Sequence, residues 1–149
     1  MIRSVVILIA VAVIVLLIPL NLSAQTAMPC KPGASSEWNS GWCDFSKPVD
    51  FKKGELLRLA IGGSATRVLV RLLPKGSDPS TPVGVIPTPF VIPRNRYLEV
   101  VLPHDAADIT QISVHGGENP WNQYHLGTGN GFATLTSIER MPIQSIPKK

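Results

Sequence analysis

The stretch that decides the fold is ELLRLAIGGSATRVLVRLL, residues 55–73. Apolar side chains alternate with polar or small ones on both sides of the Gly62-Gly63 pair. A period of two is typical of β-strands that bury one face and expose the other. The pattern therefore predicts strands over residues 55–61 and 67–73, with a turn between them.

These two predicted strands admit two arrangements. In a hairpin, Leu59 would lie opposite Val68 and Leu57 opposite Val70, which gives one continuous apolar face. The other face would then gather three positive side chains, Arg58, Arg67 and Arg71. Alternatively, the two strands belong to different sheets.

Short apolar runs between turn residues recur along the rest of the chain, and helical spacing is absent from them. The further strands that we expect cover residues 83–86, 90–92, 97–102, 109–114 and 132–140. So many short strands predict an all-β, two-sheet antiparallel sandwich. A jelly-roll-like topology is our first expectation and an immunoglobulin-like one the second, because the cysteine and tryptophan spacing of immunoglobulin domains is absent.

The domain organisation expected from the sequence has four parts. Residues 1–24 form a signal peptide, residues 25–48 an irregular segment stapled by a disulfide, residues 49–141 the sandwich, and residues 142–149 a tail. The signal peptide is indicated by Arg3, the apolar run that follows and the small residue Ala24 at the expected cleavage point. The alternative is an uncleaved membrane anchor, although the apolar run is shorter than the roughly 20 residues that a spanning helix needs.

The cysteines Cys30 and Cys43 are the two in the chain. An even pair in an exported protein is most simply a disulfide. A disulfide that closes the loop between them stabilises the folded state by about 3 kcal/mol, because it lowers the entropy of the unfolded chain. Trp38 and Trp42 lie close by in sequence, and we expect them either to cover the disulfide or to extend a stacking surface.

Charge excludes one class of partner. The chain has 149 residues, with 14 Lys and Arg against 10 Asp and Glu, a net charge of +4. The positive residues are scattered and form no block of like charge, so we expect no nucleic-acid partner. The length is that of one domain with a real core.

A long glycine-rich segment, residues 115–131, is the one stretch with recognition chemistry. Loops of this length are often functional, and sugars are bound by flat aromatic faces together with amides and carboxylates. The candidate ligand-binding residues are Glu118, Asn119, Trp121, Asn122, Gln123 and Tyr124. The alternative is that Trp121 packs on the core and the glycines and asparagines serve turns.

A metal site is a weaker alternative in the same loop. His115, Glu118 and His125 are possible zinc ligands, and through them the chain would be a metal-dependent hydrolase. Their spacing matches no motif in which secondary structure brings the ligands together. We therefore predict no metal, no cofactor and no catalytic residues.

Together these patterns predict a secreted or periplasmic, extracytoplasmic module that is not an enzyme and that binds a glycan or another cell-surface ligand. The alternative is an envelope structural or protein-interaction protein, with an edge strand near the prolines of residues 83–92 accepting a partner. In both cases membrane contact would occur only through an uncleaved N-terminal segment.

Overall fold

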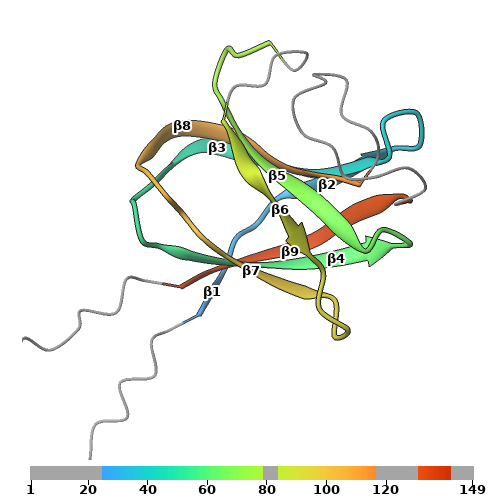
Figure 1. Cartoon of the computed structure of the whole chain (residues 1–149). Coiled ribbons are helices and arrows are strands. Elements are labelled where there is room, and N and C mark those ends of the chain that lie inside the picture. Colours follow the sequence, from blue (N-terminus) through green and yellow to red (C-terminus); the bar gives the residue numbers. More distant parts are fainter. Residues whose placement is uncertain (1–24, 79–83, 117–130, 142–149) are drawn as a thin grey trace, which may run out of the picture.

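The computed structural model describes residues 25–78, 84–116 and 131–141, which form nine strands and no helix (Figure 1). In chain order these are β1 (Thr26–Ala27), β2 (Lys31–Ser35), β3 (Ser40–Phe51), β4 (Leu56–Gly63), β5 (Arg67–Pro74), β6 (Val85–Val91), β7 (Tyr97–Val101), β8 (Ala106–His115) and β9 (Ala133–Met141). The prediction of an all-β chain with two antiparallel sheets is confirmed. No helix that could cross a membrane is found in this described part.

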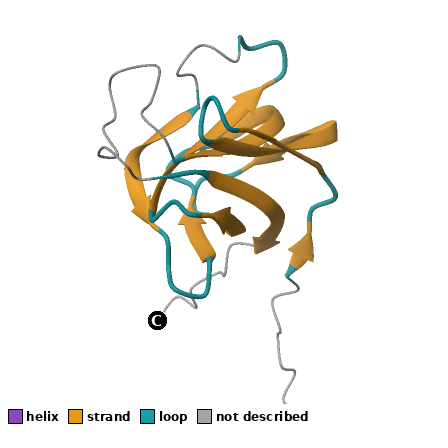
Figure 2. Ribbon diagram, turned by 90° about the vertical axis from the view of Figure 1, so that its right-hand side faces the viewer, coloured by secondary structure: helices purple, strands orange, loops and turns teal. Residues whose placement is uncertain are grey.

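One sheet has four strands in the order β1-β9-β4-β7, and the other has five in the order β2-β3-β8-β5-β6. The two sheets face each other as layers (Figures 1 and 2). Alternate residues of both sheets point into the space between them and form one apolar core. The largest fully buried side chains of this core include Phe51, Leu57, Leu59, Ile112, Leu135 and Ile138.

The hairpin interpretation of residues 55–73 is wrong, and the alternative of two sheets is correct. Leu59 on β4 lies opposite Leu98 of β7 on one side and Ile138 of β9 on the other. Strand β5 belongs to the other sheet, between β8 and β6. The alternation correctly gave the core-facing side of each strand, but β5 also buries Leu69 and Arg71 on its other face. The chain crosses between the layers after Gly63 instead of turning within one sheet.

The predicted face with three arginines is therefore also wrong. Arg58 lies on the four-stranded sheet, where its guanidinium is 4.3 Å from the centre of the Tyr97 ring. Arg67 and Arg71 lie on β5 in the other sheet. Arg71 is only 3% exposed, so it is not a solvated surface residue.

The crossing from β4 to β5 is held by Arg96, which precedes β7. Its guanidinium donates hydrogen bonds of 2.9–3.1 Å to the carbonyl oxygens of Ile61, Gly62, Gly63 and Ala65. A charged donor that satisfies several carbonyls of one turn fixes the path of the backbone there. Arg96 itself has a positive φ of 64°, an uncommon conformation for a residue other than glycine.

Residues 25–48 are not irregular, contrary to the prediction. They contain β1, the β2–β3 hairpin and the first part of β3, which pairs with β8. Pro32, Gly33 and several polar residues hide the strand pattern of β2. The strands predicted separately at 83–86 and 90–92 are joined in one strand, β6, which continues through two prolines at the edge of its sheet.

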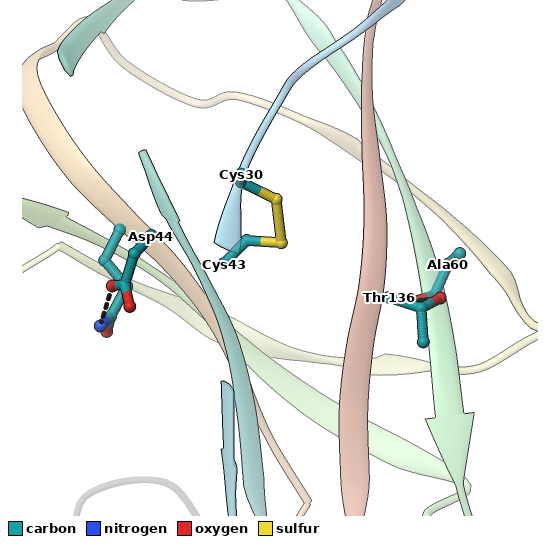
Figure 3. The surroundings of a disulfide bond; sticks show 6 residues. Cys30, Cys43, Asp44, Ala60 and Thr136 are labelled. Carbon is teal, nitrogen blue, oxygen red and sulfur yellow. Dashed lines mark hydrogen bonds between the residues drawn. A yellow bond between two sulfur atoms is a disulfide. The ribbon is translucent and has the colours of Figure 1, made fainter. Parts of the chain in front are cut away.

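The predicted disulfide between Cys30 and Cys43 is confirmed (Figure 3). It ties the residue before β2 to β3, and Cys43 is fully buried in the core. Disulfides persist in oxidising compartments, so the bond is an indication, though a weak one, that the chain works outside the cytoplasm. Trp42 points to the opposite face of β3 from Cys43 and does not cover the bond, because successive side chains of a strand alternate.

At the end of the sandwich where β4 begins, a partly buried ion pair lies against the core. The Arg140 guanidinium donates to both carboxylate oxygens of Glu55 at 2.7–3.0 Å, and Glu55 is 7% exposed. The same carboxylate accepts the Lys52 backbone N–H at 2.7 Å. Arg140 also lies over the ring of Phe51, 5.0 Å from its centre.

Candidate functional site

The candidate site is the opposite end of the sandwich, where the described parts of three connections are hydrogen-bonded to one another. These are the β2–β3 turn at residues 36–39, the β4–β5 crossing at residues 64–66, and the connection from β8 to β9 that contains the predicted ligand loop. Of that loop, the structure describes His115, Gly116 and Gly131. The other predicted ligands, Glu118, Asn119, Trp121, Asn122, Gln123, Tyr124 and His125, fall in residues 117–130 and lie outside the described residues.

The two ends of the loop are drawn together at its base. The Asn39 carbonyl accepts the backbone N–H of Gly116 at 2.9 Å and that of Ala133 at 3.4 Å, so one residue holds both sides. On the other side, Phe132 accepts the Ala65 N–H at 2.9 Å and donates its own N–H to the Ser64 hydroxyl at 3.2 Å. The base is therefore fixed by the two neighbouring turns.

Two glycines allow this close approach. A Cβ on Gly116 would lie 2.7 Å from the Gly131 carbonyl oxygen and 2.8 Å from the Ala65 Cβ. Gly131 has a φ of +95°, which side-chain-bearing residues rarely adopt. The alternative interpretation, in which glycines of this segment serve its backbone geometry, is thus supported at these two positions.

An exposed tryptophan stands beside this base. Trp38 is in the β2–β3 turn, directly before Asn39, and it remains 49% exposed. Asn39 has a φ of 47°, a left-handed conformation that asparagine tolerates better than most residues. The turn therefore presents the indole of Trp38 to solvent next to the residue that closes the loop.

A row of side chains crosses the outer face of the five-stranded sheet over three neighbouring strands. Trp42, Ser113 and Arg71 are direct neighbours on β3, β8 and β5. Their side chains point away from the core, because the alternate residues Val70, Ile112 and Cys43 belong to it. Ser113 and Arg71 are nonetheless only 2% and 3% exposed. Burial lowers the pKa of the Arg71 guanidinium, although an arginine keeps its charge at neutral pH.

His115, the first residue of the predicted loop, joins this row. Its Nε2 lies 3.0 Å from the Ser113 hydroxyl. Burial, and secondly the positive charge of Arg71, lower the pKa of His115 from its ordinary 6.5 to about 4. The imidazole is therefore neutral at pH 7, which makes it a hydrogen-bonding group and a poor proton donor there.

Chemically, this end exposes the aromatic surface of Trp38, while the Ser113 hydroxyl and the charged Arg71 guanidinium are buried beneath the surface. Among the described residues no three His, Cys, Asp or Glu side chains converge as a metal site. The predicted metal set is represented there by His115 alone.

Sequence reasoning did not identify Asn39, Ser113 or Arg71 as parts of this end. Asn39 carried a usable signal, since asparagine followed by Ser40 and Gly41 is typical of a turn. The row of Ser113 and Arg71 left no signal in the sequence, because these residues become neighbours only when strands that are far apart in the sequence pair. Comparison with protein-family models, with curated proteins and with solved structures gave no match.

Proposed function

We propose that the protein is an extracytoplasmic, non-catalytic β-sandwich module that binds a carbohydrate at the loop end of the sandwich. The observation that carries the proposal is the half-exposed Trp38, held by the turn whose Asn39 closes the glycine-rich loop. A solvent-facing indole stacks on the C–H face of a sugar ring. The ligand-binding residues predicted within residues 117–130, chief among them Trp121 and Tyr124, would complete the site.

Within the proposal, the sandwich is a jelly roll. Leaving β2 aside, the strands pair from the outside inwards: β1 with β9, β3 with β8, β4 with β7 and β5 with β6. All four pairs are antiparallel, and each next pair lies in the other sheet. This nested order supports the jelly-roll assignment over the immunoglobulin-like one.

Export is part of the proposal. It is supported by the disulfide and by the signal-like pattern of residues 1–24. N-terminal sequencing of the protein recovered from outside the cytoplasm tests it. A chain that begins after Ala24 is expected, whereas one that retains Met1 would favour an anchored form.

The binding proposal is tested on a glycan array with the wild type and three variants. Trp38→Ala and Trp121→Ala should each weaken retention by about tenfold or more, a loss of about 1.4 kcal/mol. Tyr97→Ala is the matched control, because Tyr97 is similarly exposed, at 41%, but lies on the outer face of the other sheet. Circular dichroism verifies that all variants fold. Equal retention by Trp38→Ala and wild type, or no retention of wild type on any glycan, would refute the proposal.

A further inference from the structure

In the described part of the chain, one of the four sheet edges is neither very short nor interrupted by proline. The edge strands are β1 and β7 in one sheet and β2 and β6 in the other. Strand β1 has only two residues, β2 contains Pro32, and β6 contains Pro87 and Pro89. Short length and proline both prevent an edge from pairing further. Strand β7, with the sequence YLEVV, has neither protection.

The backbone of β7 shows which groups are available. The Arg96 carbonyl accepts the Ile61 N–H, and the Leu102 N–H donates to the Glu55 carbonyl, both at 2.9 Å. Because alternate residues of an antiparallel strand bond to the same neighbour, the even-numbered residues face β4 and the odd-numbered ones face outwards. The Tyr97 N–H is taken by the Asn95 side chain. Glu99 and Val101 therefore direct their N–H and C=O groups away from the described part of the sheet.

The side chains around this edge are unusually apolar for an exposed strand. Val101 is 61% exposed and Tyr97 41%. Just beyond Val101, a cavity of about 390 Å³ is lined by residues of β5, β6, β8 and the β7–β8 connection, including Leu102, Leu72 and Ile86. A strand added to β7 would point alternate side chains towards the core, and those near Leu102 would reach this cavity.

The charges across the four-stranded sheet indicate which side chain a strand added to β7 should carry. Glu139, Arg58 and Glu99 are neighbours on β9, β4 and β7. The Arg58 guanidinium lies 3.9 Å from the Glu139 carboxylate, so the row alternates negative, positive, negative. A basic residue in the next position would continue the alternation favourably. A second copy paired symmetrically about Glu99 would instead set two carboxylates opposite each other, which is unfavourable.

We propose that the β7 edge binds an extended segment of a partner protein, with a basic residue opposite Glu99 and apolar residues on either side of it. The segment adds to the four-stranded sheet as an antiparallel strand. Backbone hydrogen bonds to Glu99 and Val101 supply affinity, while the cavity and the carboxylate select the sequence. This site is separate from the loop end and does not depend on carbohydrate binding.

The test uses the disulfide-bonded protein and a labelled probe, acetyl-Thr-Leu-Thr-Leu-Lys-Val-Thr-amide, followed by fluorescence polarisation. A second peptide carries Glu in place of Lys. We expect saturable binding of the lysine peptide and roughly threefold to tenfold weaker binding of the glutamate peptide. Glu99→Lys should reverse that order. At saturation, hydrogen exchange of the Glu99 and Val101 amides should slow.

Val101→Pro removes an outward N–H that serves no described hydrogen bond, so it should weaken binding about tenfold and leave the melting temperature unchanged. Val101→Thr keeps the N–H and serves as the matched control, expected to bind like wild type. Unchanged binding by Val101→Pro, or equal affinity for the two peptides, would overturn the proposal. So would a dimer on gel filtration that Val101→Pro converts to a monomer, since a second copy would then occupy the edge.

Discussion

Acidification should lower the stability of the fold, because His115 is buried and lies near the positive charge of Arg71. The folded protein holds the pKa of His115 near 4, whereas the unfolded chain has the ordinary value of 6.5. Between these two values the unfolded state binds more protons than the folded state. Stability therefore falls as the pH drops from about 6.5 towards 4.

The size of the effect follows from the two pKa values. At pH 7 the histidine is neutral in both states, and its contribution to the pH dependence is close to zero. At pH 5 it is protonated in nearly all unfolded molecules and in few folded ones, so linkage gives a loss of about 2 kcal/mol relative to pH 7. For a single domain this is a substantial share of total stability.

Urea unfolding at pH 7 and pH 5, with wild type and His115→Gln, measures this loss. Glutamine retains a hydrogen-bonding side chain near Ser113 but does not titrate in this range. We expect the variant to lose about 2 kcal/mol less than wild type over the same two pH units. Equal losses in the two proteins, or an NMR titration that places the pKa of His115 near 6.5, would show that the histidine is not shielded as the structure indicates.

Three further predictions concern stability. Arg96→Met should lower the free energy of unfolding by roughly 3 kcal/mol in urea titrations, because the carbonyls at the β4–β5 crossing lose a charged donor; a change below 1 kcal/mol would contradict the role given to this residue. The double variant Cys30→Ser with Cys43→Ser should lose about 3 kcal/mol, and reduction of wild type should reproduce that loss. Glu55→Gln should cost roughly 2 kcal/mol by weakening the bidentate pair with Arg140, and a melting temperature equal to that of wild type would rule this out.

The sequence was sufficient to identify the strands with strong alternation and the face that each one buries. Leu57 and Leu59 point into the core as predicted, and so do Val68 and Val70. It was not sufficient to pair them. The alternation shows which side chains one strand buries. Its pairing partner in the sheet depends on which connection crosses between the two layers. Here that crossing depends on Arg96, more than 30 residues further along the chain.

The same distinction explains what was missed at the site. The glycine-rich composition of residues 115–131 pointed to the loop, and the loop base is indeed closed by Gly116 and Gly131. The buried position of Arg71 had no signal in the sequence, because an arginine on an alternating strand normally faces solvent. Its neighbours Ser113 and Trp42 come from strands that meet only in the folded sheet.

Hydrogen bonds link three segments of the chain at the loop end. The Ala65 carbonyl accepts the Arg96 guanidinium, and the Ala65 N–H donates to the Phe132 carbonyl at the loop base. A chain of hydrogen bonds thus runs from the start of β7, through the β4–β5 crossing, to the base of the connection between β8 and β9. Under the binding proposal, these bonds would hold the ends of the connection in place before a ligand arrives. Such preorganisation would reduce the ordering cost of each contact that its side chains make with a sugar.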